Sequence, residues 1–261
     1  MLTPGTITQL ADELAIADRE HTMIPRITAR YPEATVEDSY AIQGVWRDRQ
    51  IAAGRRLIGR KIGLTSRAMQ QATGITEPDY GVMFDDTVHD SGAVIPAAHF
   101  SNVRIEVELA FVLKEALSGP DCTLEAVIAA TDYVVPALEV LNSHIELEGR
   151  TIVDTISDNA AYGAMVLGTV HRRPEEIDLR WVPGVLCKNG QVEETGVAAG
   201  VLGHPARGVA WLADKLHQHG DRLEAGEIIL AGSFTRPVWV EAGDTVLADY
   251  GDLGTVECRI A

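Results

Sequence analysis

The sequence predicts an α+β protein in which a helical N-terminal segment, residues 1–55, precedes a β-rich roll or barrel, residues 56–261. The first segment reads as helix, whereas beyond it short β-like runs alternate with Gly, Pro and Asp turns. Many short strands with few helices favour a roll or barrel over a doubly wound α/β sheet. The chain also has no G-x-G-x-x-G motif and no P-loop, so nothing in it indicates nucleotide binding.

Two helices are expected in the N-terminal segment. The first is "TITQLADELAIADRE", residues 6–20. The second begins after Thr35, whose hydroxyl suits an N-cap, with Glu37 and Asp38 in the first turn where negative charge favours a helix start. This helix is expected to stop at Gly54.

The remaining elements follow in order along the chain. Helical spacing marks residues 123–132 and the amphipathic stretch 204–220, which ends at a glycine. The last stretch, 239–260, reads as a hairpin with glycine-aspartate turns. Other strand-like runs are residues 56–64, 104–113, 133–141, 163–170, 180–190 and 227–232.

Charge and composition narrow the range of partners. The chain has 22 Lys and Arg against 38 Asp and Glu, a formal net charge of −16, which argues against nucleic acid or an anionic membrane as a partner. Neither a signal-peptide pattern nor a membrane-length apolar run is present, so we expect a cytoplasmic protein. The three cysteines are far apart, which indicates neither a disulfide framework nor a zinc–thiolate site.

The run "RIEVELAFVL", residues 104–113, has carboxylates on one face of a strand. Alternate residues share a face, so Glu106 and Glu108 point the same way, and the opposite face from Ile105 to Leu113 is wholly apolar and must be core. Two such side chains, about 7 Å apart along the strand, can converge on one ion. The alternative is a solvated face on which Arg104 neutralises Glu106.

Glu139 adds a third carboxylate, inside the apolar run "DYVVPALEVL". A buried carboxylate is costly unless it is paired or bound to a metal. Three oxygen ligands without a nearby Cys or His suit a hard cation, Mg²⁺ or Mn²⁺. A structural salt bridge to Glu139 is the alternative.

Seven motifs occurring in a fixed order make the chain similar to a known family. They are "GRKIGLTSRAMQ", "EPDYGVMFDD", "RIEVELAFVL", "DYVVPALEVL", "DTISDNAA", "ETGVAAGVLGHPARGVAWLADKL" and "AGSFTRPVWVEAGDTVLADYGDLGTVECRI". Together they resemble the hydratase and decarboxylase branch of the fumarylacetoacetate hydrolase superfamily. Within that branch the chain looks most like the 2-oxohept-4-ene-1,7-dioate hydratases of aromatic meta-cleavage pathways.

This resemblance implies a fold, a metal and an assembly. The fold would be a mixed β-roll, as in the C-terminal domain of fumarylacetoacetate hydrolase, and it would be the catalytic domain. Mg²⁺, with Mn²⁺ as the second choice, would be held by Glu106, Glu108 and Glu139. Members of the branch form homo-oligomers, often dimers assembled into larger rings such as decamers.

The implied reaction adds water to a 2-oxo-enoate or its 2-hydroxy-2,4-dienoate tautomer, and it needs positioned acids and bases. Lys61 in "RKIGLTS" is the first candidate, with a pKa that burial beside a metal would lower. Asp79 in "EPDYG" is the second, as a base or to orient water. Without the family, Lys61 reads as a surface lysine and Asp79 as a turn residue after Pro78.

Three further residues are candidates for substrate binding: Ser233, Arg236 and Asp158. Arg236 could grip a distal carboxylate with two hydrogen bonds, as a seven-carbon diacid would require, or it could pair with a surface acid. Asp158 in "SDNAA" reads equally well as turn chemistry. His204 in "GHPARG" most simply caps the helix that follows it.

Four alternatives compete with this hydratase. The nearest is decarboxylation of 4-oxalocrotonate, which would use the same metal site. Hydration of 2-hydroxypenta-2,4-dienoate is a variant with a shorter substrate, and hydrolysis of an acylpyruvate would call for a strong water-activating base. A non-catalytic partner subunit is the alternative of a different class, although Lys61 and all three carboxylates are present.

Overall fold

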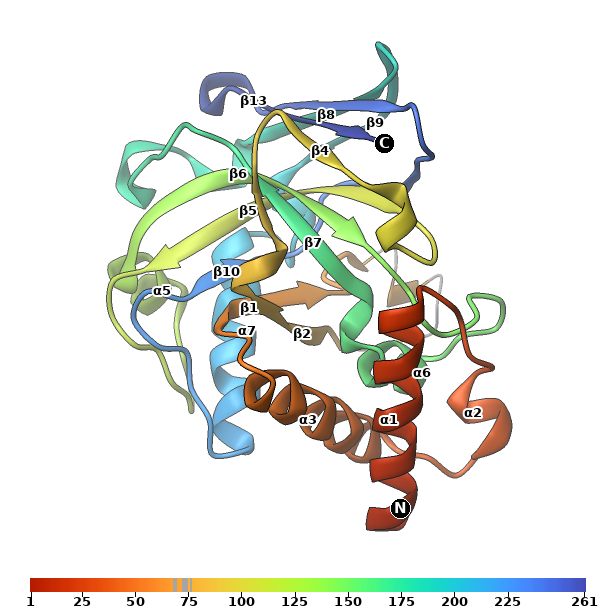
Figure 1. The fold of residues 1–261 in the computed structure, drawn as a ribbon. Helices are drawn as coiled ribbons and strands as arrows, with labels where there is room; N and C mark the ends of the chain where they lie inside the picture. Colours follow the sequence, from red (N-terminus) through yellow and green to blue (C-terminus); the bar gives the residue numbers. More distant parts are fainter. Residues whose placement is uncertain (68–69, 72–74, 76) are drawn as a thin grey trace.

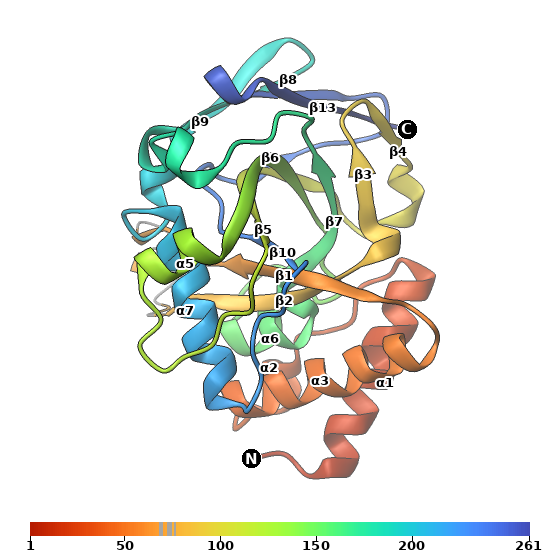
Figure 2. The same cartoon turned by 90° about the vertical axis from the view of Figure 1, so that its left-hand side faces the viewer.

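The computed structural model describes residues 1–67, 70–71, 75 and 77–261, and it joins two β-sheets to a layer of helices (Figure 1). The helices α1 and α3 lie beneath β1 and β2, and the smaller sheet lies at the opposite end of the molecule (Figures 1 and 2). The described helices are α1 (Pro4–Glu20), α2 (Ile27–Arg30), α3 (Val36–Ala52), α5 (Leu124–Ala130), α6 (Ile152–Ser157) and α7 (Pro205–Gln218).

The larger sheet has the strand order β2-β1-β10-β5-β6-β7-β3, with β11 paired to β5. β1 runs parallel to β10, whereas β5, β6 and β7 form antiparallel pairs in sequence. These strands are β1 (Leu57–Gly63), β2 (Asp79–Phe84), β3 (Val88–Asp90), β5 (Arg104–Leu113), β6 (Thr131–Leu141), β7 (Tyr162–Leu167), β10 (Ile228–Leu230) and β11 (Val238–Trp239).

The smaller sheet has the order β4-β13-β12-β8-β9. The predicted C-terminal hairpin is confirmed, because β12 and β13 pair antiparallel around a short turn that begins at Gly251. The strands are β4 (Ala93–Ile95), β8 (Pro183–Lys188), β9 (Gln191–Val197), β12 (Thr245–Asp249) and β13 (Thr255–Ile260).

The main apolar core confirms the predicted alternation along β5. Ile105, Leu109 and Phe111 are fully buried in it. Helix α7 contributes its apolar face to the same core, including fully buried Val209 and Leu212. A chain that buries one face of β5 so completely directs the other face, with its carboxylates, to the opposite side of the sheet.

The N-terminal helices share a second core with the sheet. Leu10 and Leu14 of α1 and Ile42 of α3 pack with Val82 and Phe84 of β2. The expected start of α3 is confirmed: the Thr35 hydroxyl accepts the Asp38 N–H, and Asp38 bonds back to the Thr35 N–H, a capping box. The boundary drawn at residue 55 stays a prediction.

In the described part of the chain, none of the helices combines the length and the apolar character that crossing a membrane requires.

Candidate active site

The candidate site lies where β5 and β6 pair. Glu106 stands directly opposite Glu139 in the antiparallel register, and Glu108 is two residues further along β5 on the same face. One oxygen from each of these three carboxylates lies within 4.8 Å of the other two. Like charges directly opposite one another destabilise a sheet, so this register calls for a compensating cation.

The burial of these carboxylates strengthens the need for a compensating cation. Glu108 and Glu139 are fully buried. Glu108 Oε2 accepts the Gly232 N–H at 2.8 Å. Among the described residues, however, Glu108 Oε1 and Glu139 Oε2 have no hydrogen-bond donor, and Glu139 Oε1 has only the ammonium group of Lys61 beside it, at 3.1 Å and without hydrogen-bond geometry. Buried oxygens without a donor cost free energy, and a divalent cation bound between them would remove that cost.

The same crowding appears in the pKa values. Burial and the charge of Glu139 raise the pKa of Glu106 to about 8. Burial, followed by the charges of Glu139 and Glu106, also raises the pKa of Glu108 well above its ordinary value. An all-oxygen set of three carboxylates without Cys or His matches the preference of Mg²⁺ or Mn²⁺, so the residues present fit such an ion.

Lys61 reaches this cluster from β1. Its side chain is buried, its Nζ lies 3.1 Å from Glu139 Oε1, and it donates a hydrogen bond to the carbonyl oxygen of Ala160 at 2.9 Å. Burial lowers the pKa of Lys61, but the charges of Glu139 and Asp79 more than offset this and the net shift is upward. Without a metal, the groups of the protein therefore raise the pKa of Lys61, whereas the sequence analysis expected it to be lowered beside a metal.

Asp79 begins β2 beside Lys61. It is buried rather than in an exposed turn, and it pairs in register with Gly63 of β1. A Cβ at Gly63 would lie 2.2 Å from Asp79 Oδ1 and 3.3 Å from Lys61 Nζ, so only glycine leaves room for both side chains there. Burial raises the pKa of Asp79 against the opposing charge of Lys61.

A left-handed turn holds the acceptor for Lys61. Asn159, Ala160 and Ala161 have φ values of 47°, 52° and 60°, a conformation that non-glycine residues rarely adopt. The side chain of Asn159 anchors the turn, because it bonds both the N–H and the carbonyl of Val82 in β2 at 2.8 and 2.9 Å. Neither Asn159 nor the Ala160 carbonyl was among the residues predicted from sequence.

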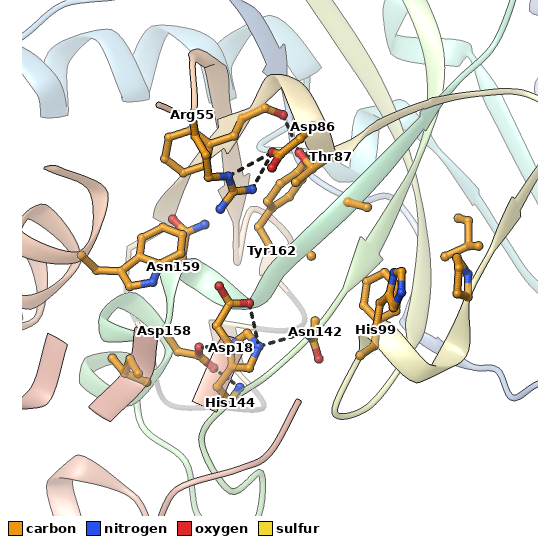
Figure 3. Close-up of a pocket in the computed structure, with 18 of the residues that line it drawn as sticks. Asp18, Arg55, Asp86, Thr87, His99, Asn142, His144, Asp158, Asn159 and Tyr162 are labelled. Carbon is orange, nitrogen blue, oxygen red and sulfur yellow. Dashed lines mark hydrogen bonds and ion pairs between the residues drawn. The ribbon is translucent and has the colours of Figure 1, made fainter. Parts of the chain in front are cut away.

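Asp158 lies one residue before this turn, in a separate pocket of about 240 Å³ between α1, α3 and the sheet (Figure 3). Its Oδ1 lies 2.8 Å from His144 Nδ1, and its Oδ2 accepts the His144 N–H at 2.6 Å. His144 Nε2 in turn lies 3.4 Å from Asp18 of α1. The charge of Asp158 raises the pKa of His144 although burial opposes it. Asp158 therefore links the loop after β6 to the N-terminal helices, and its predicted role toward substrate stays a prediction.

The remaining candidates lie after β10. Ser233 makes a local turn, donating to the Thr235 carbonyl at 2.9 Å and accepting the Thr235 N–H at 3.1 Å. The side chain of Arg236 is 75% exposed and pairs with Glu194 at 2.6 Å. Their substrate-binding roles stay predictions. The capping role of His204 is confirmed, because its Nδ1 accepts the Ala206 N–H at the start of α7.

The structure brings five of the predicted site residues together: Lys61, Asp79 and the three carboxylates, which come from four different strands of the larger sheet. The other three, Asp158, Ser233 and Arg236, have the separate contacts described above. Strand alternation was enough to place Glu106 and Glu108 on one face. Their register against Glu139 is a long-range pairing, for which spacing carries no signal.

Comparison with known proteins places this site in a family. Residues 58–261 match the family model described as fumarylacetoacetate (FAA) hydrolase C-terminal. The 2-oxo-hept-4-ene-1,7-dioate hydratase of Escherichia coli is 51% identical, over 99% of each chain. The 2-keto-4-pentenoate hydratase of Paraburkholderia xenovorans is 38% identical, over 98% of this chain and 95% of the relative.

A solved structure agrees with these relatives. The 4-oxalocrotonate decarboxylase from Pseudomonas putida G7, complexed with magnesium and adipate, superposes with a TM-score of 0.97 at 36% identity, covering 100% of this chain and 99% of the other. Its fold confirms the predicted architecture of a β-roll with N-terminal helices. The chain therefore belongs to the fumarylacetoacetate hydrolase family, in its hydratase and decarboxylase branch.

Proposed function

We propose that the protein is a metal-dependent hydratase of the lyase class, which adds water to 2-oxohept-4-ene-1,7-dioate to give 4-hydroxy-2-oxoheptanedioate. The observation that carries this proposal is the convergence of three carboxylates, two of them fully buried, beside buried Lys61 and Asp79. The 51% identity to a hydratase of this substrate over 99% of both chains supports the choice of reaction.

Glu106, Glu108 and Glu139 would hold the divalent cation, with Mg²⁺ as the physiological ion and Mn²⁺ as a substitute. When bound, such an ion supplies a Lewis acid that offsets the charge of the substrate carboxylate and of its 2-oxygen. It also explains how a chain with a net charge of −16 binds a dianion. The relative with magnesium and adipate, a straight dicarboxylate, supports this choice of ion and ligand.

Lys61 and Asp79 would move the protons. The ammonium group of Lys61, buried beside the carboxylate cluster, would donate a proton or a hydrogen bond to the oxygen at C2. Asp79, buried beside Lys61, would accept a proton and return it. The hydroxyl of the added water would go to C4 while a proton goes to a neighbouring carbon.

Decarboxylation of 4-oxalocrotonate is the second candidate, because a decarboxylase superposes at a TM-score of 0.97. It would use the same cation and the same Lys61. The two reactions differ only in whether CO₂ leaves or water enters, and products distinguish them directly. A non-catalytic partner subunit ranks lower, because the three carboxylates and Lys61 are all retained in one cluster.

The test uses purified protein with Mg²⁺ and three substrates supplied separately: 2-hydroxyhepta-2,4-diene-1,7-dioate, 2-hydroxypenta-2,4-dienoate and 4-oxalocrotonate. The loss of diene absorbance is followed over time, and the molecular masses of the products are determined by mass spectrometry. A gain of one water, lost with EDTA and in Glu108→Gln, is the expected result. Loss of CO₂ would make the protein the decarboxylase. Turnover that persists after complete removal of metal would overturn the role of the three carboxylates.

We further propose that the protein acts in the cytoplasm as a homo-oligomer built from dimers. The molecular mass of the purified protein in solution tests the oligomer. The mass of a monomer would contradict the proposal.

A further inference from the structure

A second set of polar groups lies at the end of the β5–β6 pair next to the carboxylates. Arg104 is two residues before Glu106 on β5, so the two side chains share a face about 7 Å apart along the strand. Leu141 is the residue opposite Arg104, and Ser143 lies two residues beyond Leu141. The loop that follows Ser143 brings Arg150 back to the same point.

Both arginines meet on the hydroxyl of Ser143. Its Oγ accepts a hydrogen bond from Arg104 Nη2 at 2.8 Å and another from Arg150 Nη1 at 2.6 Å. A serine hydroxyl has two acceptor positions and one proton, so with both acceptor positions used the proton can be donated elsewhere. Ser143 is fully buried, which keeps water from competing for that proton.

The two positive charges at this point are not neutralised within the described residues. In the described part of the chain their recorded partners at this point are the neutral side chains of Asn102 and Ser143, and the buried Nε of Arg104 has no hydrogen-bond acceptor. Arg104 is only 8% exposed. Two like charges held together, that of Arg104 buried and that of Arg150 half-buried, favour the binding of an anion between them.

The guanidinium of Arg104 is held in place on its other sides. Its Nη2 also donates to Asn102 Oδ1 at 3.1 Å. Its Cζ lies 5.3 Å from the ring centre of Trp239, on the β11 strand that pairs with β5. Such a fixed, planar donor suits a carboxylate, which guanidinium groups bind through two parallel hydrogen bonds.

We propose that Arg104, Ser143 and Arg150 bind the distal carboxylate of the substrate and so select a 2-oxo dicarboxylate over the corresponding monocarboxylate. This inference rests on the proposed function, because it takes the carboxylate cluster to hold the other end of the substrate. Six carbon–carbon bonds of about 1.5 Å, extended in a zigzag, span roughly 7–8 Å. The side chain of Arg104 leaves the strand about 7 Å from Glu106, so its guanidinium group is near enough to meet the far end of such a chain.

Arg236 is the rival for this role. Its side chain is 75% exposed and already pairs with Glu194, whereas Arg104 is buried and unpaired among the described residues. An exposed, paired arginine must give up its partner and its hydration to bind a substrate carboxylate. The two assignments differ in which arginine, when replaced, removes the preference for the dicarboxylate over the monocarboxylate.

The test measures binding rather than turnover. The affinity of the Mg²⁺-loaded protein is compared by calorimetry for 2-oxoheptanedioate and for 2-oxoheptanoate, which ends in a methyl group. Arg150→Gln is the main variant because Arg150 is less buried than Arg104. Arg150→Lys keeps the charge, and Ser143→Ala removes the hydroxyl. Arg222→Gln is the matched control, since this exposed arginine pairs with Glu224 on the surface.

We expect Arg150→Gln to weaken binding of the dicarboxylate by about tenfold or more and to leave the monocarboxylate within about twofold. Arg150→Lys should recover part of the loss, and Arg222→Gln should change neither ligand. Equal weakening of both ligands in Arg150→Gln would overturn the proposal, as would no change in either. Loss of the discrimination in Arg236→Gln instead would assign the distal carboxylate to Arg236.

The test of the anion site and the test of the proposed reaction can fail independently. If the protein binds the dicarboxylate through Arg150 yet hydrates none of the oxo-enoates, the reaction is wrong and the anion site stands. If it hydrates the seven-carbon and five-carbon substrates and Arg150→Gln reduces kcat/KM for both equally, the reaction stands and the anion site is wrong.

Discussion

The ammonium group of Lys61 on β1 lies 3.1 Å from Oε1 of Glu139 on β6, and both side chains are buried. Lys61 faces four carboxyl groups here, the three of the cluster and Asp79, so the site has an excess of carboxyl groups over ammonium groups. That excess is the physical basis of the predictions below.

The first prediction concerns metal binding. Glu139→Gln should abolish the stabilisation by Mg²⁺, which for the native protein should reach about 2.7 kcal/mol at a hundred times the dissociation constant. The metal-free variant should be less stable than the metal-free native protein, because Lys61 loses its nearest buried counter-ion. Thermal unfolding with EDTA and with Mg²⁺ measures both effects. An undiminished response to Mg²⁺ would contradict the assignment of Glu139 as a ligand.

The second prediction concerns Lys61. Lys61→Met should lower kcat by about 10²–10⁴-fold, the range expected for loss of a general acid or base, while Mg²⁺ binding persists. Steady-state kinetics and calorimetry with Mg²⁺ check the two parts. Lys188→Met, at a lysine whose Nζ bonds the carbonyl oxygen of Trp239, serves as the control. Equal activity of the two variants would remove Lys61 from the mechanism.

The third prediction concerns pH and the metal-free protein. The folded pKa of Glu106 is about 8, above its ordinary value, so the folded state binds more protons than the unfolded state between these values. Stability should therefore be highest near pH 5 and fall as the pH rises through 8. Because Glu106 is partly exposed, the loss should be about 1–3 kcal/mol.

Urea unfolding at pH 5.5 and pH 8.5 tests this, with EDTA and with Mg²⁺. The decline should shrink when Mg²⁺ is present, because a bound cation favours the ionised carboxylates. A metal-free protein that becomes more stable toward pH 8.5 would contradict the charge excess.

The fourth prediction concerns the room around Asp79. In Gly63→Ala the new Cβ would lie 2.2 Å from Asp79 Oδ1, so the carboxylate must move and kcat should fall by about tenfold or more. Gly5→Ala in α1 is the matched control, because its nearest neighbour would be 3.9 Å away. That change should leave kcat unaltered and stabilise the helix by about 0.5–1 kcal/mol. Kinetics and thermal unfolding of the two variants separate these effects.

The sequence was sufficient where the determinants are local. Thr35 and Asp38 form the expected helix start, and the apolar alternation of β5 predicts both its core face and the shared face of Glu106 and Glu108. It was insufficient where distant segments meet. Arg104 and Arg150 come together only because a loop closes on Ser143, and no spacing rule reports such a closure.

The direction of the Lys61 pKa shows the same limit. From sequence, burial was the dominant effect to expect. The structure adds the charges of Glu139 and Asp79 from two other strands, and their combined effect reverses the shift. The sign of a pKa shift in a buried cluster therefore depends on the sheet topology as much as on the residue.

The shared core of the N-terminal helices and β2 has a consequence for how this chain can be divided. Val82 and Phe84 turn one side of β2 toward α1 and α3, while Asp79 begins the same strand. A fragment starting at residue 56 would leave that side of β2 open to water and would lose the support under Asp79. The family match begins at residue 58, whereas the core that supports β2 reaches back to α1, so we expect a fragment that begins at residue 58 to be less stable than the full chain.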